Sequence, residues 1–220
     1  LSWWQQIHEL SRDFTCVTFD HRGFALSPNH NGIGAEAFAT DLAQLLDHLG
    51  ITAVFLIGQS MGGRTALNFA KSFPHRTRAI VMSGSVANIR TPELDEMRRE
   101  VSQAIPDRLE AALRREFWQE RPEMGYLYKL IRQRNPERPR QFLWQDNQNG
   151  TSPEELASLE APTLLLVGDE DRICPPKLVE LILPYFKNAK LLRAPDAGHS
   201  IYFERPHYFN LTVAQFFAQY

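Results

Sequence analysis

The sequence predicts an α/β protein with a mostly parallel, doubly wound sheet and one helical insertion. Short apolar runs, typical of buried parallel strands, alternate with segments whose apolar residues recur at helical spacing. This alternation places helices on both faces of a parallel sheet. It breaks between residues 86 and 161, where charged, Arg-rich helical patterns follow one another. We therefore predict a core of residues 1–85 and 162–220 and an insertion of residues 86–161.

The first part of the predicted core contains two helices, each followed by a strand. Residues 3–11 are predicted to form a helix and residues 14–19 a strand. Residues 35–49 form the second predicted helix, because their apolar residues share one face and Gly50 ends the pattern. Residues 53–57 are all apolar and are predicted to form a buried strand.

Helices and strands continue to alternate outside the insertion. The helix after residue 63 is expected to stop at Pro74, which cannot continue it. The insertion has two helix starts, a cap at Thr91-Pro92-Glu93 and a capping box over residues 152–155. The other predicted elements are the strands 78–83, 164–167 and 189–193 and the helices 176–184 and 207–220.

The segment Gly58-Gln59-Ser60-Met61-Gly62-Gly63 lies between a predicted strand and a predicted helix. In this context G-x-S-x-G describes a nucleophile elbow, a strained turn that holds a serine hydroxyl up at the end of a sheet. We expect the flanking glycines to be required, because the turn brings the strand and helix backbones too close for side chains. The alternative is an ordinary glycine-rich turn. The strand and the helix favour the elbow, with Ser60 as the nucleophile.

A serine nucleophile needs a base to take its proton and a third group to orient that base. His199 lies in the loop after the strand 189–193, and three acids follow the strand 164–167. Both loops leave the carboxyl ends of strands, where the sites of open α/β sheets lie. The order serine, acid, histidine is that of elbow-type triads. We predict His199 as the base and one of the acids as its orienting group.

From the residues alone, more than one acid is a candidate. Asp169 competes with Asp171, although Asp169 has the alternative role of capping the turn after the strand. Glu170 is a third candidate. The other histidines are expected to be structural or surface residues, because five precede the acids and the last is predicted to start a helix. They are His8, His21, His30, His48, His75 and His207.

Three further segments carry a resemblance to a known family. Residues 19–27 resemble the motif D-x-R-G-x-G-x-S, and residues 168–176 resemble the acid loop G-x-x-D…P. Residues 198–206 resemble the closing segment G-H-S…E-x-P. With the elbow, these motifs make the chain resemble the α/β-hydrolase-fold superfamily of esterases, lactonases and peptidase-like enzymes. The resemblance implies that Asp171 is the acid of the triad and that residues 86–161 form a cap over the site.

The N-terminus departs from the family pattern. Residues 2–7 resemble the helix that follows a His-Gly loop in this family, and that loop supplies one N–H of the oxyanion hole. By the resemblance, a further strand belongs between the segments 14–19 and 53–57. We expect the chain to be a fragment that lacks its N-terminal strands, with the N–H of Met61 as one oxyanion donor and the second donor absent. Loss of one donor costs about 10²–10³ in turnover.

The insertion contains aromatic and basic residues with two possible roles. Trp118 and Trp144 are predicted to line the site for an apolar acyl or ring substrate. The alternative is that such aromatics pack the cap onto the core. A basic stretch is expected to be a solvated helix face, or alternatively a clamp for a substrate carboxylate or phosphate. It comprises Lys129, Arg132, Arg134, Arg138 and Arg140.

The composition restricts the function classes. A chain of 220 residues with 43% apolar content can bury one substantial core. The net charge of −2 gives no indication of a nucleic-acid partner, and no apolar run approaches a membrane span. Cys16 is expected to be a buried strand residue and Cys174 a loop residue near the site. No metal motif or phosphate loop occurs, so no cofactor is expected, and cytoplasm is the default location.

These features predict a cofactor-independent serine hydrolase. The substrate is expected to be a small carboxylic ester or lactone that is cleaved through an acyl-enzyme by Ser60, His199 and Asp171. One alternative is another reaction of the same triad, such as carbon–carbon bond hydrolysis, a lyase step or cofactor-free perhydrolysis. Others are a non-catalytic ligand-binding protein and an inactive fragment. The sequence predicts neither the substrate nor the oligomeric state.

Overall fold

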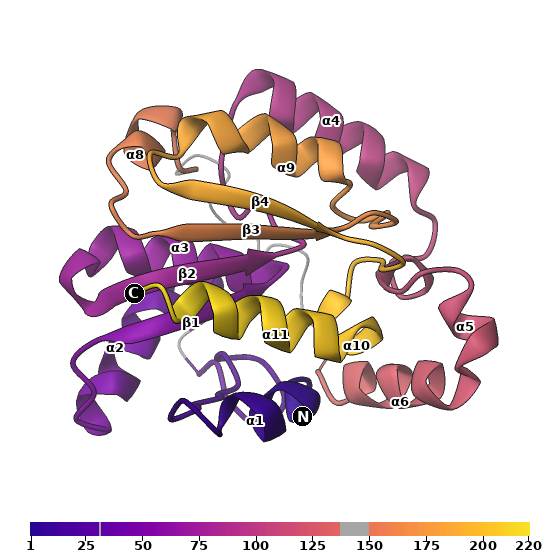
Figure 1. Ribbon diagram of the computed structural model, residues 1–220, viewed down its shortest axis with the longest axis horizontal. Helices are drawn as coiled ribbons and strands as arrows, with labels where there is room; N and C mark the ends of the chain where they lie inside the picture. The colour runs from indigo at the N-terminus through magenta and orange to yellow at the C-terminus, as the bar shows by residue number, and fades with distance from the viewer. Residues whose placement is uncertain (31, 137–149) are drawn as a thin grey trace.

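A computed structural model of the chain describes residues 1–30, 32–136 and 150–220. In this part, four parallel strands form one sheet in the order β1-β2-β3-β4 (Figure 1). The strands are β1 (Val54–Gln59), β2 (Thr77–Ser83), β3 (Thr163–Gly168) and β4 (Ala189–Ala194). All four were predicted from their apolar runs, and the predicted doubly wound α/β fold is confirmed.

Helices cover both faces of the sheet, and side chains alternate between two apolar clusters. Ile80 and Met82 of β2 pack in one cluster, whereas Ala79 and Val81 pack in the other. This alternation follows from the period of two in a strand. The first cluster involves α2 (Phe38–His48), α3 (Met61–Ser72) and α9 (Pro176–Ile182), and the second involves α1 (Trp4–Leu10), α10 (Ile201–Glu204) and α11 (Pro206–Phe217).

The chain between β2 and β3 is helical in its described part. It contains α4 (Pro92–Ala104), η3 (Glu110–Ala112), α5 (Phe117–Glu120), α6 (Pro122–Gln133) and α8 (Pro153–Ala157). Both predicted helix starts are confirmed, since the Thr91 hydroxyl accepts the N–H of Leu94 and Ser152 forms a capping box with Glu155. In Figure 1, α5 and α6 lie beyond the carboxyl ends of the strands, next to α10.

Three short 3₁₀ turns complete the described elements: η1 (Gly34–Ala37), η2 (Pro74–Arg76) and η4 (Leu183–Tyr185). Two of them replace the ends of predicted α-helices. The predicted helix 35–49 begins as η1, and the predicted helix 176–184 ends in η4. Within the described residues, no helix has the length and apolar character needed to span a bilayer.

The predicted strand 14–19 is wrong. Residues 15–20 have no regular secondary structure, and in the described chain the sheet ends at β1. An extended segment becomes a strand only when a neighbour pairs its N–H and C=O groups. Because this segment joins no sheet, the expectation that Cys16 is buried is also wrong, and its thiol is exposed.

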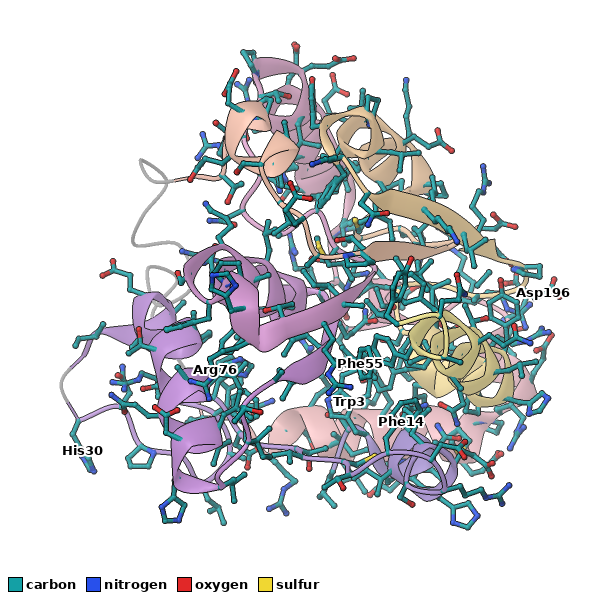
Figure 2. The ribbon with its side chains drawn as sticks, turned by 60° about the vertical axis from the view of Figure 1, so that its left-hand side comes forward. Trp3, Phe14, His30, Phe55, Arg76 and Asp196 are labelled. Carbon is teal, nitrogen blue, oxygen red and sulfur yellow. The ribbon has the colours of Figure 1, made fainter. Side chains whose placement is uncertain are left out.

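Aromatic side chains hold the N-terminal segment against the core. The ring of Phe14 packs edge-on at 5.9 Å from Phe55 of β1 and at 6.0 Å from Phe217 of α11. The indole of Trp3 lies 5.0 Å from the ring of Tyr202 in α10. Figure 2 shows Trp3, Phe14 and Phe55 close to α1 and α11, on one side of the sheet. Residues 1–20 therefore pack through side chains rather than through a β-ladder.

Replacing Leu67 by Ala should reduce the free energy of unfolding by about 2–5 kcal/mol, because the substitution leaves a cavity in the core. Leu67 is 0% exposed, between α3 and the sheet. The matched control is Leu26→Ala, since Leu26 is 86% exposed, and it should change stability by at most about 0.5 kcal/mol. Urea unfolding of both variants measures the difference, and equal losses would contradict this assignment of the core.

Candidate active site

Ser60 occupies a strained turn between β1 and α3. Its backbone has φ 52° and ψ −114°, a conformation that costs a non-glycine residue about 1–3 kcal/mol. The surrounding chain fixes this geometry. The Ser60 N–H donates to the Ser83 carbonyl at 2.8 Å, and the Ser60 carbonyl accepts from the Ser85 hydroxyl at 2.6 Å. This is the geometry that the G-x-S-x-G pattern predicts.

The glycines around Ser60 differ in their importance. A Cβ on Gly58 would lie 2.4 Å from the Gly62 carbonyl oxygen, and one on Gly63 would lie 2.4 Å from the Ser85 hydroxyl. A Cβ on Gly62 would meet no atom within 4 Å. The expectation that both motif glycines are required by close backbone approach is therefore right for Gly58 and wrong for Gly62. The second glycine that close packing requires is Gly63, which lies outside the five-residue motif.

Asp171 and His199 form a buried pair at the carboxyl ends of β3 and β4. The His199 Nδ1 lies 2.8 Å from one carboxylate oxygen of Asp171 and 3.1 Å from the other. Asp171 Oδ1 also accepts the N–H groups of Ile173 and Cys174, at 2.8 and 2.7 Å. These bonds fix the carboxylate, which in turn orients the imidazole. With a proton on Nδ1, the Nε2 atom is free to accept a second one.

Gly84 and Gln59 bring this pair next to the elbow. Gly84 follows β2 with φ 52°, and a Cβ on it would lie 3.0 Å from His199 Nδ1 and 3.1 Å from Asp171 Oδ2. Gln59 directly precedes Ser60, and its amide donates to the His199 carbonyl at 2.7 Å. In the described part of the chain, the Ser60 hydroxyl forms no hydrogen bond with His199. Such bonds are often long in unliganded enzymes.

The competing acids lie elsewhere. Asp169 accepts the Nε–H of Arg193 at 2.6 Å on the exposed surface, and Glu170 is exposed. The carboxylate that contacts His199 therefore belongs to Asp171. This position agrees with the register that the family resemblance implied.

Comparison with known proteins places the chain in a family. It matches the alpha/beta hydrolase fold family over residues 1–117 and 100–206. The chain belongs to this family. A solved thermophilic esterase from Thermogutta terrifontis is 27% identical, with a TM-score of 0.80, and the match covers 99% of this chain and 85% of the esterase. The family and its named esterases and hydrolases identify this α/β-hydrolase-fold protein as a hydrolase-type enzyme.

Two further relatives differ in their named reactions. A putative 2-succinyl-6-hydroxy-2,4-cyclohexadiene-1-carboxylate synthase of Bacillus subtilis is 27% identical over 97% of this chain and 84% of its own length. A 2-hydroxy-6-oxo-2,4-heptadienoate hydrolase of Pseudomonas putida is 39% identical, over 39% of this chain and 32% of its own length. The relatives therefore identify the family of this α/β-hydrolase-fold protein, but their different reactions do not identify its substrate.

Met61 is the first residue of α3, directly after Ser60. Backbone N–H groups in the first turn of a helix have no partner within the helix and point out of its N-terminus. We therefore expect the N–H of Met61 to face an oxyanion formed at Ser60, where the positive end of the helix dipole also favours negative charge. Its role as a donor stays a prediction.

Trp118 contacts other parts of the insertion. Its indole N–H donates to the Glu110 carbonyl at 3.0 Å, and the ring covers Gly125 of α6. The Lys129 ammonium lies 5.2 Å from the ring centroid. These contacts favour the packing role over a substrate role. Lys129, Arg132 and Arg134 are exposed, in agreement with a solvated face, whereas Trp144, Arg138 and Arg140 lie outside the described residues.

Two reactive side chains outside the candidate triad are held in their neutral forms. Burial raises the pKa of the Cys174 thiol well above its ordinary value, so Cys174 is no thiolate nucleophile. Burial lowers the pKa of His21 to about 4, and its Nε2 lies 3.0 Å from the Thr65 hydroxyl. His21 packs against Phe38, with ring centroids 4.3 Å apart, which agrees with its expected structural role.

The sequence did not identify every residue that positions the site. Gly84 carries no motif, and only the fold shows that its missing side chain leaves room for His199 and Asp171. Gln59 occupies one of the two variable positions of the elbow motif. Glu204 was recognised only as part of the E-x-P segment, yet its carboxylate binds the N–H of Gly198, next to His199.

The two motif glycines give a matched pair of variants. Gly58→Ala should lower the midpoint of thermal unfolding and cost about 1–3 kcal/mol or more, because its Cβ would overlap backbone atoms. Gly62→Ala should be neutral or slightly stabilising, since it meets no atom and adds helix propensity. Calorimetry of the two variants measures the effect. A Gly62→Ala protein as unstable as Gly58→Ala would disprove this geometry of the elbow.

Proposed function

We propose that this protein is a serine hydrolase that cleaves a small carboxylic ester or lactone through an acyl-enzyme. The observation that carries the proposal is the buried hydrogen bond of 2.8 Å between His199 and Asp171, next to the strained turn at Ser60. An imidazole oriented by a buried carboxylate beside an elbow serine is the arrangement that activates a hydroxyl.

The proposed reaction has two steps. His199 Nε2 takes the proton of the Ser60 hydroxyl while the oxygen attacks the carbonyl carbon, and Asp171 stabilises the imidazolium that forms. The N–H of Met61 donates to the oxyanion. His199 then returns the proton to the leaving alcohol. In the second step a water molecule, deprotonated by His199, releases the carboxylic acid and restores the Ser60 hydroxyl.

The substrate side of the proposal rests on the insertion and on the similarity to an esterase. We propose that residues 86–161 form a cap and that residues 1–85 and 162–220 form the hydrolase core. The helices α5 and α6 of the insertion lie beyond the strand ends that carry Asp171 and His199 (Figure 1). A roof of this kind excludes water and selects the acyl group. The 27% identity to the Thermogutta terrifontis esterase supports an ester as the substrate.

Carbon–carbon bond hydrolysis is the second candidate function. The observation that favours it is the 39% identity to the Pseudomonas putida hydrolase over 87 residues. In that case the same serine and histidine cleave a ketone with a carbanion leaving group. A panel of p-nitrophenyl esters, lactones and a 2-hydroxy-6-oxodienoate separates the two functions. Only a carbon–carbon bond hydrolase cleaves the dienoate faster than the esters.

Asp171→Asn should reduce turnover of an activated ester by about 10³–10⁴, since the amide holds His199 in the wrong tautomer. Asp169→Asn is the matched control in the same loop. Its carboxylate binds Arg193 on the surface, so this variant should retain activity within about twofold. Steady-state kinetics of both variants measures the difference. Equal losses, or a loss only in Asp169→Asn, would contradict the proposed triad.

Ser60→Ala completes the test. This variant should lose turnover of every substrate in the panel while keeping the fold, as circular dichroism can verify. A purified wild-type protein that cleaves none of the panel, or a Ser60→Ala protein that keeps its function, would instead favour a ligand-binding role.

A further inference from the structure

Glu204 is a buried carboxylate that the proposed reaction does not use. It ends α10, is 8% exposed and lies five residues after His199. Its Oε1 accepts the N–H of Gly198 at 3.0 Å, and its Oε2 accepts the N–H of Arg114 at 2.8 Å. One carboxylate thus joins the loop that carries His199 to a segment of the insertion that lies 90 residues before Glu204 in sequence.

The two joined segments are in close contact. A Cβ on Gly198 would lie 2.6 Å from the Arg114 nitrogen and 2.9 Å from the Leu113 carbonyl carbon. On the other side of His199, the N–H of Ser200 donates to the Ala112 carbonyl at 3.1 Å. The Ser200 hydroxyl lies 2.9 Å from the phenol oxygen of Tyr128 in α6. Ser200 is therefore hydrogen-bonded directly to the insertion, whereas Gly198 is linked to it through the Glu204 carboxylate.

The surroundings of Glu204 have opposing effects on its pKa. Burial raises the pKa of Glu204 to about 7, although the two N–H bonds and the guanidinium of Arg114 oppose this shift. The Arg114 guanidinium is itself paired with Glu120 at 2.7 Å. Other titratable groups nearby include Tyr128, whose phenol is neutral because burial raises its pKa and which interacts with both Glu204 and Asp171, and Glu116, which lies 3.8 Å from the Arg114 guanidinium. The imidazole of His199 is next to Gly198 in the chain.

We propose that Glu204 is a positioning residue that holds His199 in its catalytic place by bridging the His199 loop and residues 113–114 of the insertion. This inference rests on the proposed function, because it assigns His199 as the base. The bridge couples the cap to the catalytic histidine, so a change in the cap at Leu113–Arg114 is transmitted to the imidazole.

The bridge depends on the ionisation of Glu204. An ionised carboxylate accepts at both oxygens, whereas a protonated one carries a hydroxyl that is a poor acceptor for the second N–H. With a pKa of about 7, the bridge is therefore complete only well above pH 7 and loosens as the pH falls through this value. Overall stability changes in the opposite direction. The folded pKa of about 7 exceeds the unfolded value of 4.5, so this group contributes stability that is lost as the pH rises between these values.

Glu204→Gln imitates the protonated acid, because the amide offers one acceptor and one donor. The ratio of wild-type to Glu204→Gln kcat/KM for an activated ester should be about 10–100 above pH 8, the size of one lost hydrogen bond to a charged group. It should approach one near pH 5.5, where the wild-type bridge is loosened as well. A purely structural role gives the same ratio at every pH.

Glu120→Gln is the control, since it removes an exposed carboxylate from the same arginine and should give a ratio near one at every pH. The inference would be overturned if the wild-type protein cleaves the ester and the ratio of wild-type to Glu204→Gln kcat/KM is the same at every pH. A wild-type protein that cleaves no ester in the panel would instead overturn the proposed function.

Hydrogen exchange of the wild-type protein tests the bridge without any variant or substrate. Protection of the Gly198 and Arg114 amides, corrected for intrinsic exchange, should fall by about 10-fold or more between pH 8 and 5.5. Core amides of β2 should keep their protection. Unchanged protection at Gly198 and Arg114 would overturn the inference even if Glu204→Gln did not fold.

Discussion

Burying an imidazole with a carboxylate is favourable only when each satisfies the polar atoms of the other. His199 and Asp171 meet this requirement, with the Asp171 carboxylate fixed by two further backbone N–H bonds. The rest of the site is arranged around this pair. Gly84 leaves room for it, Gln59 ties it to the elbow, and Glu204 ties it to the insertion. Asp171, His199, Gly84 and Gln59 all lie at or just after the carboxyl ends of strands, so the parallel sheet brings them together, whereas Glu204 lies at the end of α10.

Ser60 and His199 are held in position in different ways. The elbow holds Ser60 in an unfavourable backbone conformation, and the bonds to Ser83 and Ser85 compensate for it. Gly58 and Gly63 allow β1 and α3 to approach closely enough for that turn. The serine is therefore positioned by its backbone, whereas the histidine is positioned by side chains. This difference explains why the serine has a clear local motif and the histidine has a weak one.

The sequence predicted the features that depend on local pattern. Apolar runs predicted the four strands, and the elbow, the acid loop and the His199 loop predicted the residues of the candidate site. The segment 14–19 failed because a strand needs a partner, which its own residues do not reveal. Gly84, Gln59 and Glu204 were missed for a related reason. Their contacts join segments that are far apart in sequence, and a single sequence carries no record of such distances.

Covalent labelling with a fluorophosphonate probe, followed by peptide mass spectrometry, tests the central claim most directly. The probe reacts with a serine only when a base and an oxyanion donor activate it. We predict one adduct, on Ser60, that forms in the native protein and is lost on denaturation. An adduct on another residue, or no adduct on a folded protein, would contradict the assignment of Ser60, His199 and Asp171 as a working site.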